Sequence, residues 1–230
     1  MSDARAPTLM SHDAFPSQAE RDAATAASHA RAAQWIAEAP LSSRADDTVL
    51  FARLIAAREV RGELPLLGLS AVQLDALFAR HFPYSSLQRE SASDAGVTAL
   101  SLLDTTHADF VASMRMLLLE HAAAEPLADD AWCVASIVAH ACLRPDHLWR
   151  DLGLDGRDDV TRMLTRYVPT LIARNTEGLR WKKFLARELA HAQGTAPGPA
   201  PGCPRCEDFG FCFGNQAAAG GVAAPPAHNV

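Results

Sequence analysis

Aromatic residues make up only 7% of this 230-residue chain. Sheets favour aromatic and β-branched side chains, whereas much of the hydrophobic share of 49% here is alanine, the strongest helix former. The composition therefore predicts an all-α fold. The length allows one compact domain plus tails, because a domain takes on the order of 100–200 residues.

Long apolar runs and an excess of positive charge are also missing. No stretch approaches the roughly 20 uninterrupted apolar residues that span a bilayer, and residues 1–24 lack the apolar segment of a signal peptide. The net charge of -6 and the sequence pI of about 5.8 offer no basic surface for phosphate backbones. We therefore expect a cytoplasmic protein that binds neither membranes nor nucleic acid.

Apolar residues recur at helical spacing along most of the chain. Ser70, followed three residues later by Gln73, has the pattern of a capping box at a helix start. Residues 131–143 are apolar almost all round, which predicts a central, buried helix. We expect a helical bundle of about six to eight helices and a polar loop at 85–99, the helical segments being roughly 19–39, 44–61, 70–83, 104–123, 131–143, 147–153, 160–168 and 177–192.

The composition changes abruptly after residue 192. Residues 193–202 are rich in proline, glycine and alanine, and we predict a linker that contributes nothing to a core. The chain is accordingly divided into a disordered N-terminal tail (1–18), a helical domain (19–192), this linker (193–202), a cysteine-rich loop (203–214) and a disordered tail (215–230).

The five cysteines are unevenly distributed along the chain. Cys133 and Cys142 lie in apolar helical sequence and are interpreted as small buried hydrophobic residues. Cys203, Cys206 and Cys212 follow the spacing C-x2-C-x5-C. Structural disulfides are rare in a reducing compartment, whereas thiolates at this spacing can face one metal ion or cluster. The pattern therefore predicts a metal-binding loop.

Three thiolates do not by themselves select the metal. Zinc requires a fourth ligand, whereas a cuboidal three-iron cluster can be held by three cysteines. Phe209, Phe211 and Phe213 either shield a cluster from water or dock the loop on the helices. A catalytic or redox role for the thiols is disfavoured, because no base lies at suggestive spacing and the βαβ context of thioredoxin-like CxxC motifs is absent. We expect a metal-binding loop rather than an enzyme's catalytic thiols.

Four blocks of sequence carry a resemblance to a known family. They are GLSAVQLDALFARHFP (68–83), PDHLWRDLGL (145–154), ARNTEGLRWKKFLARELA (173–190) and CPRCEDFGFCFG (203–214). In order and spacing they resemble the NifQ family, over about residues 35–214. This likeness is more specific than a lone CxxC motif.

The resemblance implies an iron–sulfur cluster able to carry molybdenum, with Cys203, Cys206 and Cys212 as its ligands. It implies a carrier that supplies molybdenum for biosynthesis of the iron–molybdenum cofactor of nitrogenase during nitrogen fixation. The partners that it implies are molybdate or another molybdenum source, the cofactor-assembly scaffold and the nitrogenase iron protein.

The chain departs from the family pattern at one position. That pattern is C-x4-C-x2-C-x5-C, and Gly198 stands where its first cysteine is expected. Either three protein thiolates suffice, or another residue substitutes, or this chain binds metal poorly. Cys142, Cys133 and His191 are the candidate substitutes, and we favour a centre with three thiolates and an exogenous ligand.

Other residues were weighed as parts of a site. His147, in a family-like block, is a further candidate ligand, and His140 is the weaker of the two histidines that flank the Arg144-Pro145 break. Trp149 and Trp181 are assigned to the core or to the docking site of the loop. The remaining candidates are basic residues expected to face mostly outward, namely Arg174, Arg180, Lys182 and Lys183. They form either a solvated helix surface or a basic face that attracts molybdate or an acidic partner.

A second hypothesis remains open. The chain is then a helical interaction scaffold with a structural zinc site, in which Cys142 or His191 supplies the fourth ligand.

Overall fold

The computed structural model describes residues 17–40, 45–85 and 97–214, with side chains in the last range from residue 107 onward. The tail predicted at 215–230, almost all of that at 1–18 and most of the loop predicted at 85–99 lie outside these residues. No helix in the described ranges is both long enough and apolar enough to cross a bilayer.

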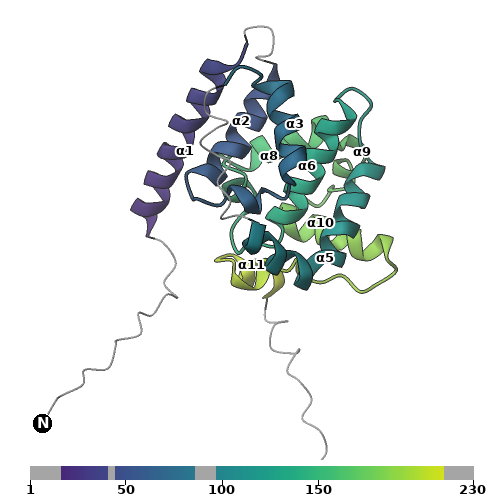
Figure 1. Cartoon of the computed structure of the whole chain (residues 1–230). Coiled ribbons are helices and arrows are strands. Elements are labelled where there is room, and N and C mark those ends of the chain that lie inside the picture. Colours follow the sequence, from purple (N-terminus) through teal and green to yellow (C-terminus); the bar gives the residue numbers. More distant parts are fainter. Residues whose placement is uncertain (1–16, 41–44, 86–96, 215–230) are drawn as a thin grey trace, which may run out of the picture.

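Regular structure in the described residues is entirely helical, which confirms the all-α prediction (Figure 1). Within the described ranges, seven helices have 11 or more residues, in agreement with a bundle of about six to eight. The elements are α1 (Gln18–Glu38), α2 (Asp46–Glu59), the 3-10 helix η2 (Leu64–Leu67), α3 (Ala71–His81), α5 (Val97–Glu120), α6 (Ala128–Ala141), α7 (Leu148–Asp151), α8 (Arg157–Tyr167), α9 (Pro169–Ile172), α10 (Trp181–Ala192), the 3-10 helix η4 (Cys203–Arg205) and α11 (Phe209–Phe213).

Helix α6 runs through the middle of the bundle, as its apolar sequence predicts (Figure 1). Ile137 and Val138 are fully buried, and α5 packs along this helix. A helix without a polar face is stable only where neighbours cover it on every side. Helices α3, α5 and α7 and the 3-10 helix η2 pack against α6, and its C-terminal end leads into the turn that precedes α7.

Two capping boxes set the starts of α1 and α3. Ser70 Oγ accepts a hydrogen bond from the Gln73 backbone N–H, and the Gln73 side chain accepts one from the Ser70 N–H in return. Ser17 and Glu20 form the same arrangement, so α1 begins at Gln18, which the sequence analysis placed in the tail. Helix α1 lies at the edge of the molecule against α2 (Figure 1).

Helix α10 begins at Trp181, four residues later than predicted. The side-chain amide of Asn175 donates to the Leu179 carbonyl and its oxygen accepts from the Leu179 N–H, so the preceding segment forms a closed turn. The expectation that Lys182 faces outward is wrong, because its side chain is buried. Its ammonium donates hydrogen bonds to three oxygen atoms, which makes this burial possible.

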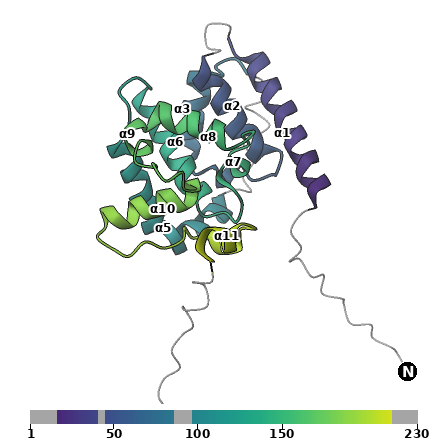
Figure 2. The same ribbon diagram turned by 180° about the vertical axis from the view of Figure 1, so that it is seen from behind.

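The segment 193–202 does contribute to the core, contrary to prediction. Ala200 is fully buried, and the Gly202 N–H donates to the Cys142 carbonyl at 3.0 Å. A Cβ atom at Gly202 would lie 1.8 Å from the Arg144 carbonyl oxygen, so only glycine fits this contact. This docking fixes η4 and α11 against one end of the bundle (Figures 1 and 2).

Candidate metal centre

Cys203, Cys206 and Cys212 line one small cavity of about 50 Å³. The cavity lies between the cysteine loop, the start of α7 and the start of α10. Cys203 is buried, whereas Cys206 and Cys212 are half-buried and remain reachable from solvent. The structure thus brings the three thiols that the spacing singled out to a single cavity.

Two short turns place the thiols. The Cys206 N–H donates to the Cys203 carbonyl at 2.9 Å, which closes the C-x2-C turn, and Pro204 occupies the first turn of η4. The Cys212 N–H donates to the Asp208 carbonyl at 2.9 Å, so α11 carries the third thiol back toward the first two. Hydrogen-bonded turns of this kind hold sulfur ligands at fixed spacing.

Burial raises the pKa of all three thiols above the ordinary cysteine value. The positive charge of Lys182 opposes this shift at Cys203 and Cys206, and Arg180 and Lys183 oppose it at Cys212. Metal binding to thiols releases their protons, and nearby cations stabilise the resulting negative charge. The local basic residues therefore offset part of the cost of ionising the thiols in this buried position.

Lys182 lies beneath this cavity and has no free hydrogen-bonding capacity. Its ammonium donates to the Arg144 carbonyl at 2.9 Å, to the Asp146 carbonyl and to Asp151 Oδ2 at 2.5 Å. An ammonium group has three donors, and all three are used here. Lys182 therefore fixes the turn between α6 and α7 against α10 while placing a positive charge beside the thiols.

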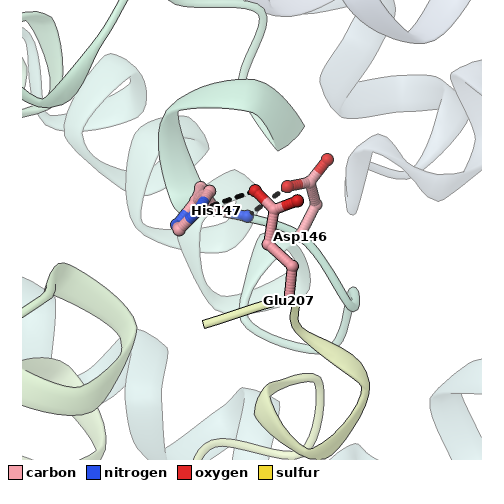
Figure 3. A group of neighbouring side chains, drawn as sticks. All are labelled: Asp146, His147 and Glu207. Atoms are coloured by element: carbon pink, nitrogen blue, oxygen red, sulfur yellow. Dashed lines mark hydrogen bonds and ion pairs between the residues drawn. The ribbon is translucent and has the colours of Figure 1, made fainter. Parts of the chain in front are cut away.

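Ion pairs hold the cysteine loop to the helices. Arg150 Nη1 lies 2.7 Å from Glu207 Oε1, and Arg180 Nη2 lies 2.8 Å from Asp208 Oδ2. His147 Nε2 lies 3.2 Å from Glu207 Oε1 (Figure 3). The same nitrogen lies 3.5 Å from Asp208 Oδ2. The hydrogen bond from Arg150 lowers the pKa of Glu207. These contacts place His147 at the cavity, which it also lines.

The aromatic residues of the loop divide into two groups. Phe209 and Phe213 line the cavity and pack partly on the core, with ring centroids 5.0 Å apart. Phe211 is 79% exposed and lies under the guanidinium of Arg180. Trp181 lines the cavity and is buried, and Trp149 lines it and stacks on His147. Docking of the loop accounts for two of the three phenylalanines.

The substitute ligands proposed for position 198 lie at different distances from the thiols. Cys142 is fully buried near Cys203, and burial raises its pKa to about 12. Cys133 Sγ lies 3.8 Å from Arg80 Nη2, away from the cavity. His191 is on the exposed surface at the end of α10, beside Glu188. Of the three, only Cys142 adjoins the cysteine loop.

Two other candidates lie outside the cavity. The ring of His140 packs at Gly68, its Nδ1 being 2.8 Å from the Ser136 carbonyl oxygen. Arg174 is paired with Glu188 at 3.6 Å. Neither residue lines the cavity of the thiols.

A larger cavity of about 340 Å³ lies between α1 and the α6–α7 turn. Asp146 lines both cavities, and Glu207 lines the larger one. Sequence reasoning missed this cavity, because α1 is distant in sequence from the other residues that form it. No local pattern in α1 signals the contact.

The residues around the small cavity fit an iron–sulfur cluster more readily than a single ion, because the sulfur atoms of the three cysteines do not all lie within 4.8 Å of one another. Three thiols supply soft ligands, basic side chains balance negative charge, and Phe209, Phe213 and Trp181 limit access of water. Fold and site together define a helical protein with a thiol-rich loop whose three cysteines line one small cavity.

Comparison with known proteins supplies the particular family. The family model NifQ matches residues 49–214, most of the chain, and the protein belongs to the NifQ family. This membership implies a role in nitrogen fixation. No solved structure matches the fold.

The similarity extends to curated relatives. The chain is 38% identical over 148 residues to the protein NifQ homolog of Sinorhizobium fredii, covering 64% of this chain and 60% of that protein. It is 34% identical over 155 residues to protein NifQ of Azotobacter vinelandii, covering 65% of this chain and 78% of that protein. It is 33% identical over 84 residues to protein NifQ of Rhodobacter capsulatus, covering 36% of this chain and 47% of that protein.

Proposed function

We propose that this protein is a carrier that binds an iron–sulfur cluster and molybdenum and supplies molybdenum for the iron–molybdenum cofactor of nitrogenase. The convergence of Cys203, Cys206 and Cys212 on one cavity is the observation that carries the proposal. It acts by coordination rather than by catalysis, in the cytoplasm. Its partners are a molybdenum source such as molybdate, the cofactor-assembly scaffold and the nitrogenase iron protein.

The half-buried position of Cys206 and Cys212 supports a role in transfer. A centre that is handed to another protein must be reachable, whereas a purely structural centre can be enclosed. Cys203 is buried, and its carbonyl accepts the hydrogen bond that closes the C-x2-C turn. Cys203 therefore remains in place while Cys206 and Cys212 are exposed to a partner.

Three thiolates are sufficient in this proposal. An iron or molybdenum atom at one vertex of a cuboidal cluster then takes a ligand from outside the chain. Lys182, Arg180 and Lys183 support the proposal, because a cluster held by thiolates carries net negative charge that these cations balance.

The proposal is tested by anaerobic purification with metal and sulfide analysis. We expect iron, sulfide and some molybdenum, and Cys206→Ser should abolish cluster loading while the far-ultraviolet circular dichroism spectrum of the helical body is retained. Cys133→Ser is the matched control, since Cys133 lies away from the cavity. A colourless protein that holds no iron and takes up none would refute the proposal.

A structural zinc site in an interaction scaffold is the second candidate, and Cys142 near Cys203 is the observation that favours it. Zinc with four sulfur ligands would then bind at one ion per chain. Chelators that leave stability and partner binding unchanged would exclude it.

A further inference from the structure

A second group of potential metal ligands lies beside the thiols. One donor atom from each of Asp146, His147 and Glu207 lies within 4.8 Å of the other two. Figure 3 shows these side chains converging from two segments, the residues just before α7 and the cysteine loop. Imidazole and carboxylate donors suit harder metal ions than thiolates do.

The separation of the donors fits a shared ion. His147 Nε2 lies 3.2 Å from Glu207 Oε1. Two ligands of one ion at bond lengths of about 2.0–2.2 Å lie about 2.9–3.5 Å apart, depending on the coordination geometry. Asp208 Oδ2 lies 3.5 Å from the same nitrogen and offers a fourth donor atom. Small side-chain adjustments therefore bring an imidazole and at least two carboxylates around one cation.

The group lies where the two cavities meet. Asp146 lines both cavities, Glu207 lines the larger one, and His147 lines the cavity of the thiols. The three residues therefore lie between the larger cavity and the cavity of the thiols.

We propose that Asp146, His147 and Glu207 form a second metal site, for a divalent transition-metal cation such as Fe²⁺, separate from the site of the three cysteines. Neutral imidazole supplies the nitrogen ligand and the two carboxylates balance the charge of the ion. This site does not depend on the thiols for any of its donors.

Arg150 is the competitor of the metal ion. Its Nη1 lies 2.7 Å from Glu207 Oε1 and 3.1 Å from Asp146 Oδ1, so the guanidinium bridges the carboxylates that would bind the cation. The Glu207 side chain is 44% exposed, and ion pairs so accessible to solvent change an equilibrium by about fivefold or less. A divalent ion with three protein ligands therefore displaces Arg150.

The experiment titrates Co²⁺, as a spectroscopic probe, into the full chain carrying Cys203→Ser, Cys206→Ser and Cys212→Ser. We expect one Co²⁺ per chain, with d–d absorption and without thiolate-to-cobalt charge-transfer bands. His147→Gln and Glu207→Gln in this background should each weaken binding by at least about tenfold, as loss of a ligand costs no less than loss of an outer-shell partner. Arg150→Gln should strengthen it by about fivefold or less.

His191→Gln is the matched control, because His191 also lies beside a carboxylate, that of Glu188, but on the far part of α10. This control should leave binding unchanged. Absence of stoichiometric binding in the folded triple variant overturns the second site, as does binding that His147→Gln leaves unchanged.

The unsubstituted chain gives an independent measurement in case the triple variant fails to fold. There His147→Gln should remove one Co²⁺ equivalent that lacks charge-transfer bands and leave the thiolate-bound equivalent in place. If the unsubstituted chain and its His147→Gln variant each bind a single Co²⁺ equivalent with charge-transfer bands, the second site is overturned and the thiol site is supported. If the unsubstituted chain binds one Co²⁺ without charge-transfer bands and none through its thiolates, the result counts against the proposed carrier and leaves the second site intact.

Discussion

Lys182 and Asp151 form a buried ion pair, in which the ammonium lies 2.5 Å from Asp151 Oδ2 and the side chains are 7% and 3% exposed. The same ammonium holds two carbonyl groups of the α6–α7 turn. The pair therefore joins α10 to the segment that carries His147. That segment lies against the cysteine loop.

Lys182→Met should lower the free energy of unfolding by about 3 kcal/mol, because removal of one partner leaves a buried charge and two carbonyls uncompensated. Urea unfolding measures the change. Lys183→Met is the matched control, since Lys183 contacts the Cys212 carbonyl and the Phe213 ring near the surface, and it should cost less than about 1 kcal/mol. Equal effects of the two substitutions would contradict a special role for Lys182.

Gly198→Cys should restore the fourth thiolate of the family pattern. A Cβ atom at this position meets nothing within 4 Å, so the substitution is compatible with the fold. An added ligand should slow the loss of iron during anaerobic gel filtration by at least roughly tenfold. Gly198→Ser adds a side chain of similar size without a thiolate and should behave like the unsubstituted chain. Equal iron retention in the cysteine and serine variants would show that position 198 does not reach the centre.

Gly202→Ala should detach the cysteine loop from the bundle, since the new Cβ would lie 1.8 Å from the Arg144 carbonyl oxygen. The backbone must shift, and such overpacking costs about 1–3 kcal/mol. Faster tryptic cleavage after Arg205 in the loop measures the detachment. Gly198→Ala, in open space, is the control. Unchanged cleavage in the Gly202 variant would mean that the loop docks through other contacts.

Stability should fall at alkaline pH partly because of Cys133. Burial raises the pKa of this thiol to about 11, although Arg80 opposes the shift. The thiol of the unfolded chain titrates near ~8.5, so above that pH the unfolded state loses a proton that the folded state keeps. The stabilisation is complete below ~8.5 and is lost as pH rises toward the folded pKa, by at most about 1.4 kcal/mol per pH unit.

Urea unfolding under reducing conditions over this pH range tests the contribution of Cys133. Cys133→Ala should make the pH dependence of the unfolding free energy shallower. An unchanged dependence would assign the effect to other groups.

Local sequence patterns predicted those parts of the fold that depend on local interactions. The capping box at Ser70 and the apolar surface of α6 are each properties of a single helix. The predicted helix start and the predicted buried helix are both confirmed. The C-x2-C-x5-C spacing likewise acts within one short loop, and its three thiols line one cavity.

The missed features depend on contacts between distant segments. Lys182 looks like a surface lysine in sequence, but the carbonyls that accept from it come from residues 144 and 146. The burial of Ala200 and the pairing of Arg150 with Glu207 have the same origin, since no periodicity or spacing records which turn will lie beneath the loop.

The cysteine loop is fastened by two unlike kinds of contact. The segment directly before it is packed through Ala200 and Gly202, whereas Glu207 and Asp208 of the loop are held by charged side chains near solvent. Dissolved salt weakens only the second kind, because it screens exposed charges and leaves packing intact. A strongly charged partner should therefore weaken the contacts of Glu207 and Asp208, which lie between Cys206 and Cys212, while the packing of Phe209 and Phe213 and the burial of Cys203 persist.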